Sequence, residues 1–341
     1  MSTDHADTAA ATGGAARRER VARRERVARN EAAAVPAVPF GPIAALYLPA
    51  TRPDRFLKAL TSGADAVILD LEDAVPAGAK DSARAEAVRL LSDRARALSD
   101  TSVHVRINSL SSPWWQRDAA ALAQAAARHP AERPAAVRVP KVESPEQVRR
   151  VAELLGGEIP LYCLIESARG LEAAYEIACA HPAVAGVALG EADLAGDLGV
   201  ADSGLAWARS RLVVAARAAG LPSPALSAYA RLDDEAGLYE SCVAGRRAGF
   251  LGRSVLHPKQ IPAVIRAFTP TAAELAAAEA TLDALGSADI MEGGTAVLAD
   301  GSFVDRAMAQ TASRTLALRH RTAEMAARAG IDTAADAREP A

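Results

Sequence analysis

The sequence predicts an α/β protein built as a (β/α)8 TIM barrel with a C-terminal helical and hairpin extension. Between residues 43 and 268, eight short apolar runs alternate with stretches of helical period. The runs are almost continuously apolar, which is typical of parallel strands buried on both faces. Eight such units favour a closed barrel over an open doubly wound sheet, and no glycine-rich dinucleotide turn follows the first run.

The apolar runs and the segments between them give the elements in order. The expected strands are 43–48, 66–71, 102–107, 136–140, 160–165, 184–189, 224–227 and 254–256. The expected helices are 53–61, 78–98, 114–128, 145–155, 169–180, 205–219, 234–248 and 258–267. Beyond them, a helix start signal predicts a helix over 269–285, Asp300-Gly301 predicts a hairpin over 294–304, and a last helix is expected over 306–319.

The domain organisation follows from this order. We expect an N-terminal arm over 1–40, a barrel domain over 41–268, an extension over 269–320 that caps a barrel mouth, and a polar tail over 321–341. The arm repeats RRERVA twice and carries too few apolar residues for a core, so it is expected to be a solvated helix or disordered. A basic arm that touches RNA is the alternative. Glu19 and Glu25 weigh against a mitochondrial presequence, which would be poor in acids.

Composition excludes several classes of function. Half of the residues are hydrophobic, 24% are charged and the net charge is −3, so neither nucleic acid nor a membrane surface is an expected partner. The three cysteines form no CxxC pair and no zinc spacing. No apolar run is long enough to cross a bilayer. We expect a cytoplasmic protein.

Ionisable residues follow six of the eight expected strands. In a barrel, the carboxyl ends of the strands share one face, and that face carries the chemistry. We therefore expect carboxylates, an arginine, a lysine and a histidine to converge on one rim of the barrel. These residues are Asp70, Glu72, Asp73, Arg106, Lys141, Glu143, Glu166, Glu191, Asp193 and His257.

Glu166 and Asp193 follow neighbouring strands, so their side chains can reach one ion between them. Carboxylates without cysteine ligands favour a hard cation such as Mg²⁺, with substrate oxygens and waters completing the shell. The alternative is a salt-bridge network with Arg106 and Arg169. Lys141 is either a Schiff-base lysine or a structural ion pair to Glu143, and the neighbouring carboxylates favour the charged, paired form.

His257 also has two interpretations. It either supports the rim residues by hydrogen bonding or starts the helix that follows, and the helix start is favoured.

Seven segments resemble the HpcH/HpaI aldolase/citrate lyase β-subunit-like family. They are LPATRPDRF at 48–56, GADAVILDLEDAV at 63–75, VRIN at 105–108, PKVES at 140–144, IESARG at 165–170, HPKQI at 257–261 and DGSFVD at 300–305. An eighth is a variant: the family usually reads Gly-Ala-Glu-Asp-Leu where this chain has Glu191-Ala192-Asp193, so one acid has moved by a position while Asp193 keeps its place. The resemblance runs from about residue 46 to residue 318 and leaves the first forty residues outside.

The resemblance implies a TIM barrel, assembled as a homotrimer or homohexamer, with Mg²⁺ as cofactor. It implies Glu166 and Asp193 as metal ligands, with Glu166 also contacting substrate. Arg106 would bind the substrate carbonyl or carboxylate and act in catalysis, and Asp70 and Glu72 would hold metal-bound water. Asp305, reaching in from a neighbouring subunit, would be the acid/base.

The implied function is a carbon–carbon lyase. It would cleave or form a 3-hydroxy-acyl-CoA such as malyl-CoA or citramalyl-CoA, with a small 2-oxo acid and an acyl-CoA as the other partners. Two alternatives stay open. One is a class II 2-oxo-acid aldolase acting on free pyruvate- or oxaloacetate-type substrates, and the other is a carrier-protein-dependent subunit of the citrate lyase β type.

Overall fold

The computed structural model describes residues 40–97, 100–287, 296–297 and 301–331. The chain divides into two compact units, one of residues 38–272 with 317–341 and one of residues 1–37 with 273–316. Within the described part, no helix is long and apolar enough to span a bilayer. Predictions about the N-terminal arm fall on residues outside the described ones.

The larger unit is built on a curled sheet of seven parallel strands in the order β6-β5-β4-β3-β2-β1-β7. Strands β1 to β6 each pair with their neighbours in sequence, as expected when helices connect successive parallel strands, and β7 pairs with β1. The strands are β1 (Ala44–Pro49), β2 (Ala66–Asp70), β3 (Ser102–Arg106), β4 (Ala136–Val139), β5 (Leu161–Ile165), β6 (Val184–Leu189) and β7 (Arg253–Val255).

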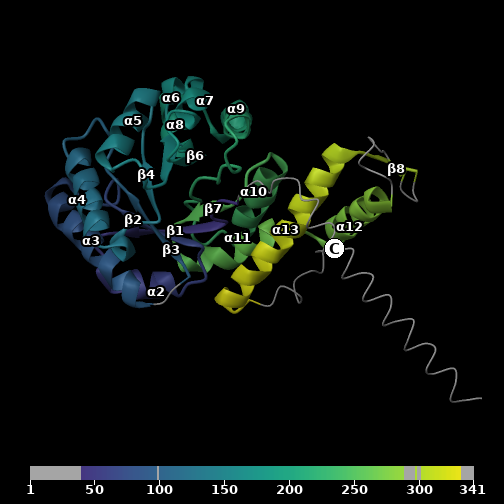
Figure 1. Ribbon diagram of the computed structural model, residues 1–341, viewed down its shortest axis with the longest axis horizontal. Coiled ribbons are helices and arrows are strands. Elements are labelled where there is room, and N and C mark those ends of the chain that lie inside the picture. The colour runs from purple at the N-terminus through teal and green to yellow at the C-terminus, as the bar shows by residue number, and fades with distance from the viewer. Residues whose placement is uncertain (1–39, 98–99, 288–295, 298–300, 332–341) are drawn as a thin grey trace, which may run out of the picture. The chain divides into compact units, whose positions relative to one another are not determined.

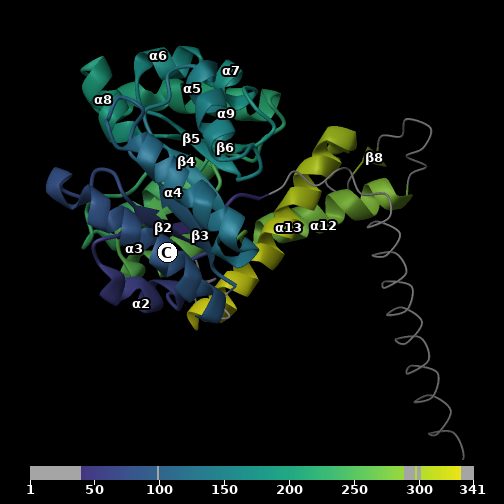
Figure 2. The same cartoon turned by 60° about the vertical axis from the view of Figure 1, so that its left-hand side comes forward.

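Helices surround the outside of this sheet (Figure 1). They are α2 (Phe56–Leu60), α3 (Lys80–Ala97), α4 (Trp115–Arg128), α5 (Pro145–Leu154), α6 (Ala168–Glu172), α7 (Ala174–Ala178), α8 (Glu191–Leu198), α9 (Ala206–Ala218), α10 (Glu235–Arg247) and α11 (Ile261–Phe268). Figure 2 shows α7 beside β5 and β6 and α9 beside β6, in agreement with the contacts between these elements.

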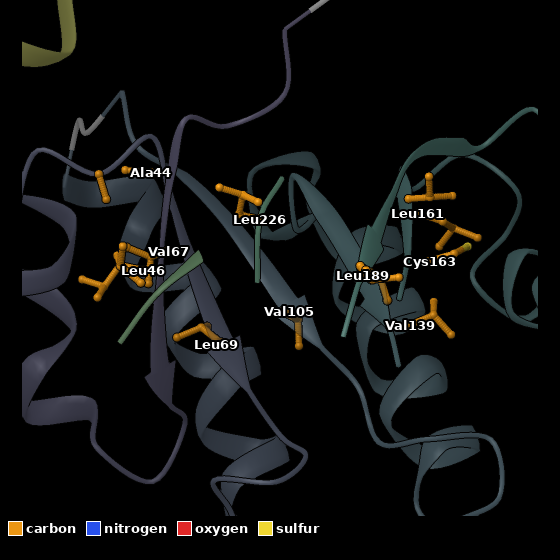
Figure 3. Close-up of a cluster of buried hydrophobic side chains, with 14 of the residues drawn as sticks. Ala44, Leu46, Val67, Leu69, Val105, Val139, Leu161, Cys163, Leu189 and Leu226 are labelled. Carbon is orange, nitrogen blue, oxygen red and sulfur yellow. The ribbon is translucent and has the colours of Figure 1, made fainter. Parts of the chain in front are cut away.

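The two faces of the sheet differ in chemistry because successive strand side chains point to opposite sides. Apolar side chains such as Leu46, Leu69 and Val105 are buried between the strands and the helices (Figure 3). The inner face instead carries polar groups at matching heights. The register pairs Asp70 with Arg106 and Arg106 with Arg138, so three neighbouring strands present charged residues side by side.

The α/β class is confirmed, and seven of the eight expected strands form. The expected strand at 224–227 is reduced to one bridge, between Leu226 and Arg253 beside β7. Pro224, the first residue of the expected strand, contributes to this because it has no N–H to donate to a ladder.

Three helical regions differ from the prediction. The expected helix at 169–180 is divided into α6 and α7. Helix α8, which carries Asp193, was not expected. The last helix, α13 (Arg306–Ala329), continues well past residue 319 into the stretch expected to be a polar tail. Arg321 and Arg328 hold this part of the helix, since both donate to the buried carboxylate of Asp65, at 2.6 and 3.1 Å.

The smaller unit contains helix α12 (Ala272–Ser287) and the antiparallel pair β8 (Ala296–Val297) and β9 (Phe303–Val304). The pair confirms the predicted hairpin, although its turn at 298–300 lies outside the described residues. Asp305 follows β9 and caps α13, with its Oδ1 accepting the amides of Ala307 and Met308 at 2.9 and 3.0 Å.

Candidate active site

A cavity of about 560 Å³ opens among the carboxyl ends of the strands, wholly within the larger unit. Its lining brings together residues from every strand of the sheet or the segment after it, as the rim prediction requires. The polar lining residues are Tyr47, Asp70, Asp73, Arg106, Arg138, Glu166, Glu191, Asp193, Ser227 and Ser254.

Arg106 is fixed at the end of β3 by Asp70. The Nε and Nη2 atoms of Arg106 donate to the two oxygens of Asp70 at 2.7 and 2.8 Å. The amides of Glu72 and Ala74 donate to the same two oxygens, at 2.9 and 3.2 Å. Burial acts to lower the pKa of Arg106, but the Asp70 carboxylate outweighs it and raises that pKa above its usual range. Each Asp70 oxygen therefore has two donors, so Asp70 positions Arg106 and has no oxygen left over for water.

Glu72 is buried in a less satisfied environment. Its carboxylate lies 2.9 Å from Arg106 Nη1 and 3.3 Å from Lys141 Nζ. These contacts are close enough for ion pairing, but among the described residues neither oxygen of Glu72 accepts a hydrogen bond of good geometry. Burial raises the pKa of Glu72 to about 7, against the lowering effect of Arg106. Glu72 thus has free acceptor capacity inside the site.

Glu166 follows β5 and points into the cavity. Its Oε2 accepts the Lys141 amide at 3.1 Å. Burial, followed by repulsion from Glu72 and Asp193, raises the pKa of Glu166 to about 7. Gly190 makes this placement feasible, because a Cβ atom there would lie 2.4 Å from Glu166 Cγ and 2.6 Å from Oε1.

Asp193 lies in the first turn of α8 and lines the same cavity as Glu166. Its side chain is half exposed and lies 3.9 Å from Lys141 Nζ. The displaced acid of the family pattern, Glu191, is engaged elsewhere: it pairs with Arg209 at 2.8 Å. The two predicted metal ligands therefore face one cavity, and the neighbouring acid does not compete with them.

Lys141 has an unusual backbone and unexpected partners. It is the one non-glycine residue with positive φ among those described, at 53°, a conformation that costs energy and is often found at functional sites. Its ammonium group lies near Glu72, Asp73 and Asp193 at 3.3 to 3.9 Å. The expected pair with Glu143 is wrong, because Ser167 Oγ donates to Glu143 at 2.8 Å. Burial acts to lower the pKa of Lys141, but Glu72 and Asp73 raise it overall, which favours the charged form over a Schiff-base lysine.

The cluster fits a divalent cation. Glu166 repels Glu72 and Asp193, and a cation between them would relieve this repulsion. In the described part of the chain, no three histidine, cysteine or carboxylate side chains converge closely enough to hold a metal by themselves. A site of two carboxylates completed by substrate oxygens and water is the arrangement Mg²⁺ commonly adopts.

His257, another predicted residue, has a structural role. His257 Nδ1 accepts the Lys259 amide at 3.1 Å and caps a short 3-10 turn, which confirms the helix-start interpretation. Asp305 belongs to the smaller unit. Sequence reasoning missed Arg138 and Tyr47 as lining residues. The signal for Arg138 was available, since an arginine interrupts an otherwise apolar strand.

Comparison with known proteins identifies the family. The model of the family described as HpcH/HpaI aldolase/citrate lyase matches residues 44–258. The chain is also 34% identical over 286 residues to a (3S)-malyl-CoA thioesterase of Cereibacter sphaeroides, covering 80% of this chain and 92% of that protein. The chain therefore belongs to the HpcH/HpaI aldolase/citrate lyase family, as the resemblance of its motifs indicated.

Further relatives include lyases. The chain is 30% identical to an L-malyl-CoA/β-methylmalyl-CoA lyase of Rhodobacter capsulatus, covering 76% of this chain and 89% of that one. Among solved structures, CitE of Mycobacterium tuberculosis in complex with magnesium, acetoacetate and coenzyme A is 32% identical, with a TM-score of 0.65, covering 83% of this chain and 99% of that chain. RipC from Yersinia pestis is 33% identical, with a TM-score of 0.58, covering 68% and 97%.

Proposed function

We propose that this protein is a Mg²⁺-dependent carbon–carbon lyase that cleaves or forms a 3-hydroxy-acyl-CoA such as malyl-CoA or citramalyl-CoA. The observation that carries the proposal is the convergence of Glu166, Asp193 and Arg106 on one cavity, beside the unsatisfied carboxylate of Glu72. The names of the relatives support a CoA-ester substrate, and the magnesium in the CitE complex supports the metal.

In this proposal Glu166 and Asp193 would hold Mg²⁺ beside the oxygens of the substrate. The ion would polarise those oxygens when bound. Arg106, held by Asp70, stabilises the negative charge that develops on the thioester oxygen, an effect worth roughly 3–4 kcal/mol at comparable sites. Glu72 accepts a hydrogen bond from a water in the site. Asp70 and Glu72 were both expected to hold this water, and in the proposal Glu72 does so alone.

The chemical balance of the cleavage is simple. The bond between the hydroxyl-bearing carbon and the carbon next to the thioester breaks, and the hydroxyl proton leaves through the water that Glu72 holds. A 2-oxo acid and a thioester enolate result. Asp305 of a second copy of the chain then protonates the enolate carbon. This role requires a homo-oligomer, for which we propose a trimer or hexamer.

Two further points belong to the same proposal. The seven strands and the 224–227 segment together form a closed (β/α)8 barrel, with that segment as the eighth strand position beside β7. The enzyme acts in the cytoplasm on a CoA thioester and a small 2-oxo acid, without nucleic acid or membrane partners.

The test compares Asp193→Ala with Glu191→Gln, a matched change at the neighbouring acid that pairs with Arg209. Asp193→Ala is expected to weaken Mg²⁺ binding by about 100-fold or more, because changing groups that only support a metal ligand already costs about 10- to 100-fold. Glu191→Gln is expected to keep Mg²⁺ binding. Isothermal titration gives the affinity, and malyl-CoA cleavage gives the activity. Retention of both by Asp193→Ala would remove the metal site.

Product analysis separates this function from its rivals. A lyase releases glyoxylate and acetyl-CoA from malyl-CoA. The (3S)-malyl-CoA thioesterase relative gives a specific reason to look also for malate and free CoA. Cleavage of free 4-hydroxy-2-oxo acids but not of the thioester would identify an aldolase. Activity that appears only on an acyl-carrier protein would identify a carrier-dependent subunit.

A further inference from the structure

Lys80 is a buried lysine at the start of α3, and it does not line the cavity described above. Only 7% of its surface is exposed. Its Nζ donates to the carbonyl oxygens of Leu71 and Glu72, at 2.8 and 2.7 Å, and lies 5.4 Å from the centre of the Trp114 ring. A lysine is seldom buried unless its charge is paired and hydrogen-bonded. The two carbonyl contacts therefore indicate a specific role for this side chain.

The two carbonyls belong to the segment that leads from the end of β2 into the site. Residues 71–75 form turns and bends rather than a helix or a strand, so few regular hydrogen bonds fix their backbone. Leu71 O belongs to the peptide group before the Cα atom of Glu72, and Glu72 O belongs to the one after it. Lys80 thus binds both peptide groups that determine the direction in which the Glu72 side chain leaves the backbone.

The charge of Lys80 also suits this segment. Asp70, Glu72 and Asp73 place three carboxylates within four residues. Burial lowers the pKa of Lys80, and the charges of Asp70 and Glu72 offset this in part, so ammonium and carboxylates stabilise one another. Arg106 and Lys141 contact the carboxylate groups themselves. Lys80 contacts the backbone that carries them and leaves their oxygens accessible to other partners.

Arg84, one turn further along α3, supports a neighbouring segment in a comparable way. Its Nε donates to the fully buried carboxylate of Asp118 at 2.7 Å. Asp118 in turn accepts the backbone and side-chain amides of Asn108, which follows β3, at 3.0 and 2.6 Å. Of these two cations of α3, Lys80 contacts the segment that carries Glu72. Arg84 is therefore a matched reference for it.

We propose that Lys80 is a positioning residue that holds Glu72 in the orientation required for the reaction. This inference rests on the proposed function, in which Glu72 holds a water of the site. Without Lys80, the peptide groups on either side of Glu72 can rotate, and its carboxylate leaves the place where it lies 2.9 Å from Arg106 Nη1. The effect of Lys80 on cleavage therefore passes through Glu72.

Hydrogen exchange of the full-length, metal-free protein, read by mass spectrometry, tests this contact without an assay of activity. The amides of Glu72, Ala74 and Val75 are hydrogen-bonded and are therefore protected. Lys80→Met is expected to speed exchange at residues 71–75 by at least about tenfold, because two buried carbonyls lose a donor. Arg84→Met is the control, and it should speed exchange near Asn108 but not at residues 71–75.

A second measurement determines whether Lys80 acts through Glu72. We compare kcat/KM for malyl-CoA cleavage among the wild type, Lys80→Met, Glu72→Gln and the double variant. Lys80→Met is expected to lower kcat/KM by at least about tenfold in the wild type and to have almost no further effect beside Glu72→Gln. Arg84→Met should change kcat/KM by the same factor in both backgrounds.

Two further variants complete the series. Lys80→Arg keeps the charge and N–H donors and should recover part of the protection and of the activity. Lys80→Gln keeps N–H donors without the charge, and it carries the same test where Lys80→Met does not fold.

Unchanged exchange at residues 71–75 in Lys80→Met would overturn the proposal. A loss of kcat/KM that persists in full when Glu72 is already changed would overturn it too. If the wild type does not cleave malyl-CoA, the lyase function fails, and the exchange data alone decide whether Lys80 holds the segment that carries Glu72.

Discussion

Each oxygen of Asp70 accepts one hydrogen bond from the Arg106 guanidinium and one from a backbone amide. Asp70 thereby joins the end of β2, the loop that follows it and the end of β3. Arg106, which faces the cavity, is thereby held in a fixed orientation, and in the proposed reaction this lowers the reorganisation required.

Asp70→Asn tests the hydrogen bonds by which Asp70 connects these segments. Asparagine cannot accept both donors of Arg106 and both amides, so a buried guanidinium loses part of its pairing. We expect a loss of about 2 kcal/mol in the free energy of unfolding and a fall of about 100-fold in kcat/KM, with Mg²⁺ affinity nearly unchanged. Asp73→Asn is the control, because Asp73 pairs with the same arginine but is 57% exposed, and it should cost under about 1 kcal/mol. Equal effects of the two changes would contradict the assignment.

Gly190→Ala tests the close approach of α8 to Glu166. The new Cβ would collide with Glu166 Cγ and Oε1, at 2.4 and 2.6 Å, so the carboxylate must move. We expect Mg²⁺ affinity to fall by at least about tenfold, while circular dichroism shows an intact fold. Gly196→Ala lies in the same helix, where nothing lies within 4 Å of the added atom, and it should leave the affinity unchanged. If both variants bind Mg²⁺ as the wild type does, Gly190 does not control the position of Glu166.

The raised pKa values of Glu72 and Glu166, each about 7, give a pH dependence with a definite sign. A carboxyl whose folded-state pKa lies above its unfolded value binds more protons when folded, so stability falls as the pH rises from about 5 to about 8. We expect the melting temperature of the metal-free protein to drop over that range. Saturating Mg²⁺ should reduce the drop, because it stabilises the ionised form. Scanning calorimetry at several pH values checks both statements, and a melting temperature that rises with pH in EDTA would refute them.

The proposed role of Asp305 predicts complementation between subunits. Asp305→Asn and Glu166→Gln should each be inactive alone, because one lacks the acid/base and the other a metal ligand. Mixed and reassembled, they should regain activity at sites that combine an intact Glu166 with an intact Asp305 from another copy. Malyl-CoA cleavage by the mixture is the measurement. Without such recovery, Asp305 is only the helix cap that its bonds to Ala307 and Met308 describe.

The rim residues were predictable because parallel strands end on one edge, so residues far apart in the chain meet there. Asp70, Arg106, Glu166 and Asp193 all line the cavity for this reason. The loss of the strand at 224–227 could also have been predicted, since the segment begins with Pro224. Strand alternation alone cannot reveal what a side chain pairs with, which is why the partners of Lys141 were predicted wrongly.

Helix α8 escaped prediction for a different reason. It is short, it contains Gly196, and of its residues only Leu194 is buried, so no apolar stripe marks it in the sequence. Its start at Glu191 nevertheless decides where Asp193 projects. Short helices after strands are stabilised by tertiary contacts rather than by an apolar stripe of their own. These contacts cannot be read from a single sequence.

Asp65 lies just before β2, and its carboxylate accepts hydrogen bonds from Arg321 and Arg328 of α13. During synthesis the strands of the sheet leave the ribosome long before these two arginines are made. Until then the buried carboxylate has only the amides of Ile43 and Ala44 as donors. The larger unit therefore completes the pairing of Asp65 only after residue 328 has been made.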